Sequence, residues 1–259
     1  MSKIQVTKRD GLKEDINLDK LHKVVFYACE GINGVSASEV EIKSNMHFYN
    51  GIKSDDIQET LIKSASELIS EETPNYQWVA GRLILYHLRK MVYGSFTPCH
   101  LLELVQRNVA DKFYDPELLE LYSEAEWNEL NDYVKHERDE NFTYAAMEQW
   151  RGKYLVQNRV TKEIKETPQA AYMLIAATLF GSYPANTRMR WVKEYYDAVS
   201  NFDISLPTPV MAGVRTPQRQ FSSCVLIETG DSLDSINATT SSIVKYVSQK
   251  AGIGIGAGS

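Results

Sequence analysis

Residues 1–94 first alternate their apolar positions and then repeat them at helical spacing. Residues 4–18 alternate apolar and polar side chains around Asp10 and Gly11, a pair typical of a two-residue β-hairpin turn. Four segments with apolar residues on one helical face follow, and they cover 18–31, 36–51, 54–70 and 73–94. The pattern therefore predicts a β-hairpin lid on a four-helix bundle.

The ends of these helices carry residues that favour helix starts and stops. Ser36 is followed by Glu39 at the spacing of a capping box, and Ser54 is followed by acidic residues that suit the positive end of a helix dipole. Thr73 stands before a proline, as an N-cap stands before the first helical residue, and Gly94 is a typical C-terminal stop.

The pattern changes again in the second half of the chain. Residues 101–200 are mostly helical, apart from 152–164, which alternate like a short hairpin. At 202–236, prolines and short β-branched runs replace helical periodicity, which predicts the first strands of a different architecture, with Cys224 in a buried strand. The predicted domains are a bundle at 1–94, a helical domain at 95–204 and the start of a strand-containing domain at 205–259.

Composition and charge limit the classes of function. The formal net charge is −6 and the pI is near 5.5, which argues against sequence-independent nucleic-acid binding. The sequence has no membrane-spanning run and no signal peptide. Its three cysteines are widely spaced and its five histidines are scattered singly, so we expect a cytoplasmic protein with no metal site.

A cluster of cations is the first candidate for chemistry. Lys8 and Arg9 lie at the predicted hairpin turn, Lys20 on the first helix, and Arg89 and Lys90 late on the fourth. If the hairpin folds over one end of the bundle, these side chains can converge on a triphosphate. The alternative is that they form an ordinary solvated surface, which is the usual role of lysines on helices.

The glycine-rich end of the sequence is the second candidate. Gly252, Gly254 and Ala257 satisfy the loose dinucleotide-binding fingerprint. That fingerprint must follow a strand and open a helix, whereas here it follows a predicted helix that starts near Ser232. We therefore expect no dinucleotide site here.

Several blocks together carry a family resemblance. They are "VTKRDG", "INLDKLHKV", "FYNGIKSDDIQETLIKSA", "GKYLVQNRVT", "PTPVMAGVRTP", "FSSCV" and "GDSLDSI". The chain resembles the N-terminal portion of the large, catalytic subunit of class Ia ribonucleotide reductase. The resemblance implies a mainly α protein. Its parts would be an ATP cone with a β-hairpin lid, a helical middle region, and the first strands and dimer helix of an incomplete α/β barrel. The resemblance also implies that residues 251–259 belong to a glycine-rich loop after the dimer helix, at a break point in a longer protein, and are no phosphate site of their own.

The resemblance implies an activity site for ATP or dATP, bound with Mg²⁺. Its residues would be Lys8, Glu14, Asp15, Ile16, Asn17, Leu18, Asp19, Lys20, Ser54, His87 and Lys90. Ser54 stands where bacterial members typically have Thr, which keeps the hydroxyl. Gln58 stands where they have His, so we expect weak inhibition by dATP.

The resemblance also assigns residues to ribonucleoside diphosphate reduction. Thr208 and Ser223 match contacts to the substrate diphosphate, and Cys224 matches one of the two redox-active thiols. The specificity site for deoxynucleotide effectors would comprise Asp231, Ser232 and Leu233, ahead of the dimer helix.

The implied partners follow from this assignment. They are a second copy of the large subunit, the small subunit that supplies the radical, thioredoxin or glutaredoxin as reductant, and a second polypeptide that carries the rest of the barrel. The chain alone is expected to be catalytically inactive. The alternatives are a non-catalytic ATP/dATP-binding module and an inactive truncation product.

Overall fold

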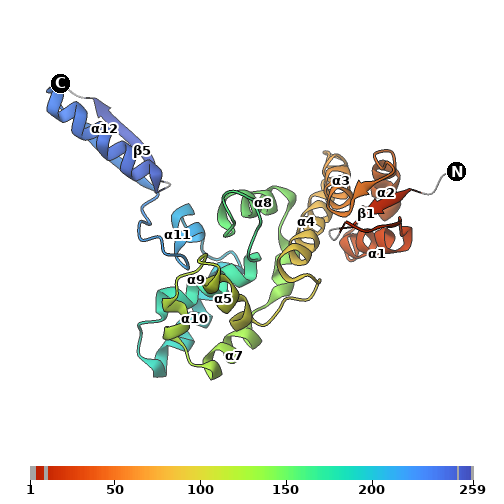
Figure 1. Ribbon diagram of the computed structural model, residues 1–259, viewed down its shortest axis with the longest axis horizontal. Helices are drawn as coiled ribbons and strands as arrows, with labels where there is room; N and C mark the ends of the chain where they lie inside the picture. The colour runs from red at the N-terminus through yellow and green to blue at the C-terminus, as the bar shows by residue number, and fades with distance from the viewer. Residues whose placement is uncertain (1–3, 9–10, 250, 258–259) are drawn as a thin grey trace. The chain divides into compact units, whose positions relative to one another are not determined.

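A computed structural model gives the structure of residues 4–8, 11–249 and 251–257 (Figure 1). The fold is mainly helical with two small sheets, as predicted. The chain forms two compact units. The first contains residues up to 98 together with 135–152, and the second contains 99–134 together with residues from 153 onward. Within the described ranges, no helix is long and apolar enough to cross a membrane.

A three-stranded sheet forms one end of the first unit. Strand β1 (Gln5–Thr7) pairs antiparallel with β2 (Lys13–Asp15) and parallel with β3 (Ile52–Lys53). Val6 and Ile52 are partners across the sheet and are buried against Ile57. The connection from β1 to β2 is longer than the two-residue turn predicted, and Asp10 lies outside the described residues.

The four predicted helices pack beside this sheet. They are α1 (Leu18–Cys29), α2 (Ala37–Asn45), α3 (Ser54–Ser66) and α4 (Tyr76–Tyr93). Helix α4 is central because it contacts α1 and α3, and also η1 (His136–Asn141) and α8 (Tyr144–Gln149), which return from later in the chain. Its fully buried apolar residues include Val79, Ala80, Leu83, Ile84, Leu85 and Leu88.

Helix α2 starts after Ser36 as predicted, but the predicted capping box at Ser36 and the predicted N-cap at Thr73 were wrong. Ser36 precedes α2 but makes no side-chain capping bond, because the Glu39 carboxylate instead accepts a hydrogen bond from the Tyr76 hydroxyl. Helix α4 begins at Tyr76, and the Thr73 hydroxyl donates to the Leu68 carbonyl oxygen at 2.7 Å. The Tyr76 hydroxyl in the first case, and the Leu68 backbone carbonyl oxygen in the second, bind a side chain that was expected to form the cap. Gly94 does end α4, in the left-handed conformation with φ of 72°.

The second unit is built around a buried helix. Helix α9 (Pro168–Phe180) is buried along most of its length and packs against α10 (Ala185–Ser200). The other helices are α5 (Leu101–Ala110), α6 (Glu117–Leu121), α7 (Glu124–Tyr133) and α11 (Thr208–Gly213). A π-helix, η2, covers Trp150–Tyr154, and the alternating segment after it closes as an antiparallel bridge between Gln157 and Ile164.

The last elements form a β–α–β unit. Strand β4 (Cys224–Thr229) and strand β5 (Gly252–Ala257) pair in parallel, and α12 (Leu233–Ser248) lies along them (Figure 1). The expectation of a glycine-rich loop was therefore wrong for 252–257. The placement of Cys224 in a buried strand was also wrong, because Cys224 begins β4 but is exposed.

Candidate functional site

A cavity of about 770 Å³ lies in the first unit, and basic side chains dominate its wall. It is lined by Lys8, Lys20, Lys23, Val24, Tyr27, Glu30, Arg82, Tyr86, Arg89, Lys90, Phe96 and Glu140. Six of these residues are basic and two are acidic, although the whole chain carries a formal charge of −6. We call it the basic cavity.

Helix geometry explains how the basic cavity is assembled. On α1, Lys20, Lys23 and Tyr27 follow one another at three- and four-residue steps, which places them on one face. On α4, Arg82, Tyr86 and Lys90 follow at four-residue steps. Since α1 packs against α4, the two faces border the same space.

Some cations of the basic cavity also bind the surrounding backbone. Arg82 donates to the carbonyl oxygen of Glu30 at 2.6 Å, and Arg89 donates to that of His136 at 2.7 Å. Lys8 Nζ lies 2.8 Å from Glu14 Oε1. Lys20 and Lys23 also line the basic cavity, from α1.

Aromatic rings form another part of the wall. Tyr86 and Phe96 meet edge to face with ring centroids 6.0 Å apart, and Lys90 Nζ lies 4.5 Å from the centroid of Phe96. Burial raises the pKa of the Tyr86 hydroxyl, so it stays protonated and can donate. Rings and cations together can bind a ligand that has both an aromatic base and phosphates.

The size of the basic cavity agrees with this chemistry. Small-molecule sites usually measure about 300–1,000 Å³. Backbone N–H groups at helix starts and lysine ammonium groups are both suited to phosphate. No cluster of three or more His, Cys, Asp or Glu side chains that could hold a metal ion occurs among the described residues.

The structure brings part of the predicted activity site together. Lys8, Lys20 and Lys90 all line the basic cavity, while Arg9 lies outside the described residues. The Asn17 side chain accepts the Lys20 N–H at 2.9 Å and so caps α1, which fixes the backbone beside Lys20.

Other predicted activity-site residues lie in or beside the sheet. Glu14 and Asp15 are in β2, Ile16 packs against the core under the sheet, and Ser54 is the first residue of α3. His87 is only 4% exposed, and its Nε2 lies 3.7 Å from Glu59 Oε1. None of these five residues is among those that line the basic cavity.

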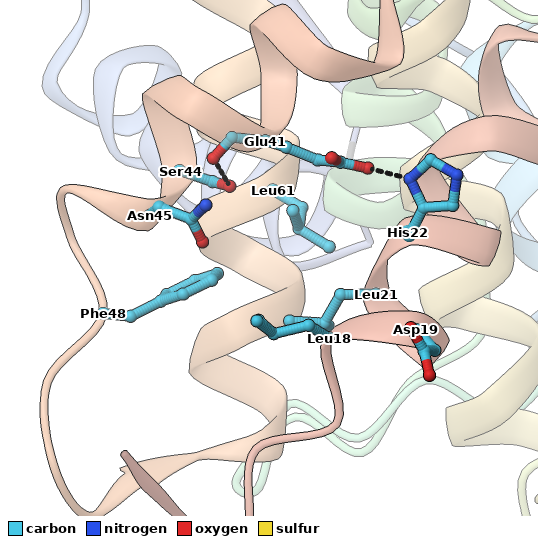
Figure 2. A pocket seen from close by; sticks show the side chains of 9 residues that line it. All are labelled: Leu18, Asp19, Leu21, His22, Glu41, Ser44, Asn45, Phe48 and Leu61. Atoms are coloured by element: carbon cyan, nitrogen blue, oxygen red, sulfur yellow. Dashed lines mark hydrogen bonds and ion pairs between the residues drawn. The ribbon is translucent and has the colours of Figure 1, made fainter. Parts of the chain in front are cut away.

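Leu18 and Asp19 line a separate, smaller pocket (Figure 2). The apolar side chains of Leu18, Leu21, Phe48 and Leu61 gather in it, and a 2.8 Å contact between His22 Nδ1 and Glu41 Oε1 borders it (Figure 2). Its volume of about 170 Å³ is below the usual range for a small-molecule site.

The predicted residues of the second unit lie at the ends of short elements. Thr208 is the first residue of α11. The Ser223 hydroxyl donates to Cys224 Sγ at 3.7 Å. Ser232 caps α12 by accepting the Ser235 N–H at 3.1 Å. Its neighbours in the chain are Asp231 and Leu233, and Leu233 is 84% exposed. Cys224 and Asp231 therefore lie toward opposite ends of β4.

Sequence reasoning missed several residues of the basic cavity. Lys23 and Arg82 were not predicted, and neither were the rings of Tyr27, Tyr86 and Phe96. The missed residues on α1 and α4 lie at three- or four-residue helical steps from Lys20 or Lys90. This spacing is a signal that could have identified them.

Comparison with known proteins gives two domain matches. Residues 4–91 match the ATP cone domain, and residues 140–219 match the all-alpha domain of ribonucleotide reductase. The first match contains most of the residues that line the basic cavity.

Curated relatives match nearly the whole chain. Identity is 59% to the ribonucleoside-diphosphate reductase 1 subunit alpha of Escherichia coli, over 98% of this chain and 33% of that protein. Identity is 57% to the ribonucleoside-diphosphate reductase subunit alpha of Haemophilus influenzae, over 98% of this chain and 34% of that protein. It is 46% to the corresponding subunit of Enterobacteria phage T4, over 100% of this chain and 34% of that protein. The chain thus spans about a third of the length of these relatives.

Proposed function

This chain corresponds to the N-terminal region of ribonucleotide reductase alpha subunits, ATP cone and all-alpha domain included, and we propose that it supplies two parts of that enzyme. One part is an allosteric nucleotide site, and the other is one redox-active thiol for the reduction of ribonucleoside diphosphates. The basic cavity is the observation that supports the proposal most directly.

The proposed effector is ATP or dATP with its Mg²⁺. Lys8, Lys20 and Lys90 bind the phosphates, because they come from three different elements and line one cavity. The rest of the predicted site, from Glu14 to Asp19 with Ser54 and His87, contacts or supports the remainder of the nucleotide. Gln58 in α3 keeps inhibition by dATP weak, since an imidazole is lost there.

The proposed redox residue is Cys224. Replacing a 2′ hydroxyl by hydrogen consumes two electrons and two protons, which two thiols supply as they close to a disulfide, with release of water. Cys29 and Cys99 are both partly buried, whereas Cys224 is exposed. We propose that the second thiol comes from the rest of the alpha subunit, and that Thr208 and Ser223 bind the substrate diphosphate.

Three other parts of the proposal concern assembly. The segments 1–94, 95–204 and 205–259 act as an ATP cone, a helical domain and the beginning of an α/β barrel. Asp231, Ser232 and Leu233 contribute to the deoxynucleotide specificity site, and α12 dimerises with a second large subunit. The small subunit supplies the radical, a second polypeptide supplies the rest of the barrel, and thioredoxin or glutaredoxin reduces the disulfide.

An alternative function is a nucleotide-binding module without catalysis. The observation that favours it is that every residue lining the basic cavity belongs to the first unit, so nucleotide binding needs no other part of the chain.

Isothermal titration of the chain with MgATP tests the effector site. A charge-assisted hydrogen bond contributes about 1.5–3 kcal/mol, so Lys20→Gln should weaken ATP binding by about 10- to 100-fold. Lys63→Gln is the matched control, because Lys63 is exposed on α3 and pairs with Glu67 one turn away. Equal affinity of the Lys20 and Lys63 variants would remove Lys20 from the site.

Reconstitution tests the catalytic part. The chain is mixed with the rest of the alpha subunit, the small subunit, MgATP, a dithiol reductant and a ribonucleoside diphosphate. Deoxynucleotide should form only with all proteins present, and Cys224→Ser should abolish multiple turnovers. Formation of no product, with ATP binding intact, would instead favour the nucleotide-binding module.

A further inference from the structure

The segment at 214–223 joins two of the proposed catalytic elements. It runs from the end of α11, which begins with Thr208, to the start of β4 at Cys224. No helix or strand occurs in this segment. Its conformation, and hence the presentation of Ser223 and Cys224, therefore depends on individual side-chain hydrogen bonds.

Arg215 anchors the beginning of this segment inside the second unit. It is fully buried and forms two hydrogen bonds with the Glu166 carboxylate, one of them 2.7 Å from Nε to Oε2. It also donates to the carbonyl oxygens of Met211 at 2.5 Å and Tyr154 at 3.0 Å. These bonds fix the end of α11 as part of the core.

Arg219 forms a second anchor nearer to the cysteine. Its Nη2 donates to the Asp115 carboxylate, and its Nη1 donates to the carbonyl oxygens of Thr216 at 3.1 Å and Gln218 at 3.2 Å. The N–H of Asp115 donates in turn to the Arg215 carbonyl oxygen at 3.0 Å. Asp115, two residues before the start of α6, thus contacts the segment at two points.

The ion pair between Arg219 and Asp115 is unequally exposed. The Asp115 side chain is 11% exposed, whereas that of Arg219 is 62% exposed. Burial alone would raise the pKa of Asp115, but hydrogen bonds from Arg219 and from the Glu117 N–H hold it below its usual value. Removing Arg219 would leave a nearly buried carboxylate without its charged partner, so the segment would shift.

Hydrogen bonds continue from Arg219 to the cysteine. The Gln220 side chain donates to the Ser222 carbonyl oxygen at 3.1 Å and accepts the Ser222 N–H. The Ser223 carbonyl oxygen accepts the Gly252 N–H from β5 at 2.7 Å. Arg219 lies four residues before Ser223 and five before Cys224, so a displacement at Arg219 would reach both through this segment.

We propose that Arg219 is a positioning residue that, through Asp115, holds Cys224 where its thiol can reduce the ribose of the substrate. The inference rests on the proposed function. Misplacement of a reacting group by about 1 Å can lower a rate by about 100-fold. Loss of the anchor should act mainly on kcat, because the thiol must meet the ribose, while Thr208 keeps its separate anchoring through Arg215.

The test uses the reconstituted enzyme with Arg219→Ala, Arg219→Lys, Asp115→Asn and the exchanged pair Asp115→Arg with Arg219→Asp. Arg190→Ala is the matched control, because Arg190 is exposed on α10 and pairs with Glu194 on the same helix. We measure kcat and KM for the diphosphate, and urea denaturation of the chain tests whether the second unit, which contains Arg219 and Asp115, is folded.

In Arg219→Ala we expect kcat to fall about 10- to 100-fold and KM to change less. The kcat of Arg219→Lys should lie between those of Arg219→Ala and the wild type. The exchanged pair should recover part of the lost kcat. Kinetics of Arg219→Ala equal to those of Arg190→Ala would overturn the proposal. If Arg219→Ala does not fold, wild-type kinetics in both Arg219→Lys and Asp115→Asn would overturn it too. A wild-type enzyme without turnover would remove the proposed function and this role with it.

Discussion

His136 shows how one partly buried side chain makes stability depend on pH. Burial first, and the positive charge of Arg89 second, lower the pKa of His136 from 6.5 to about 4. Arg89 also donates to the His136 carbonyl oxygen, so the two residues are held together at the basic cavity. An unfolded chain binds the proton at higher pH than the folded one, and acidification therefore favours unfolding.

Between pH 7 and pH 5, the free energy of unfolding should fall by about 2 kcal/mol on account of His136. The loss begins as the pH drops through 6.5 and is complete near 4. His136→Gln should remove this part of the pH dependence, while His47→Gln, at an exposed position, should keep it. Urea denaturation at the two pH values measures both, and a His136→Gln variant as pH-dependent as the wild type would contradict the assignment.

At the residue scale, the sequence predicted some of the residues that line the basic cavity and missed others. Lys20 and Lys90 could be proposed because cations were counted along the chain. Lys23 and Tyr86 lie one helical step away from them and were missed. Which helical faces meet depends on packing between α1 and α4, and that is not encoded at any fixed spacing in the sequence.

At the scale of elements, helices were predictable because their apolar residues repeat locally, whereas pairing of distant strands was not. The glycines of β5, considered alone, predict a loop. Ile253 and Ile255 nevertheless alternate with glycine, and parallel pairing with β4 supplies hydrogen bonds that override the low strand preference of glycine. Cys224 is exposed because it is the first residue of β4, in a sheet that has two strands within the described ranges.

Gly81 is required where α4 passes the returning segment. A Cβ at this position would lie 2.2 Å from the Phe142 carbonyl oxygen, which is backbone and cannot rotate away. Gly81→Ala should therefore lower the free energy of unfolding by about 1–3 kcal/mol. Gly152→Ala is the control, since nothing lies within 4 Å of the Cβ it would add. Urea denaturation compares the two, and equal stabilities would show that the contact can relax.

At the scale of the whole molecule, α12 exposes an apolar stripe. Leu233, Ile236, Val244 and Val247 are all exposed and recur at three- and four-residue steps or their multiples. This is the surface by which we expect large subunits to dimerise. The sequence predicted the helix, and the structure adds which side of it remains open.

Val244→Glu should weaken self-association of the chain, because it places a charge in the middle of this apolar stripe. Ala238→Glu is the control, since Ala238 is also exposed but lies on a different face of α12. Sedimentation velocity over a range of concentrations measures the effect. Equal dimer fractions for the two variants would exclude the stripe as the interface.

The return of residues 135–152 to the first unit has a consequence for protein synthesis. The segment supplies the Phe142 backbone against Gly81, the carbonyl oxygen that Arg89 binds, and an ion pair from Arg151 to Glu59 at 2.8 Å. A ribosome that has translated only the first 98 residues has made the whole basic cavity except Glu140, but not the packing behind α4. The nascent unit must wait for more than fifty further residues before it can close, and until then the emerging helices expose apolar surface that chaperones recognise.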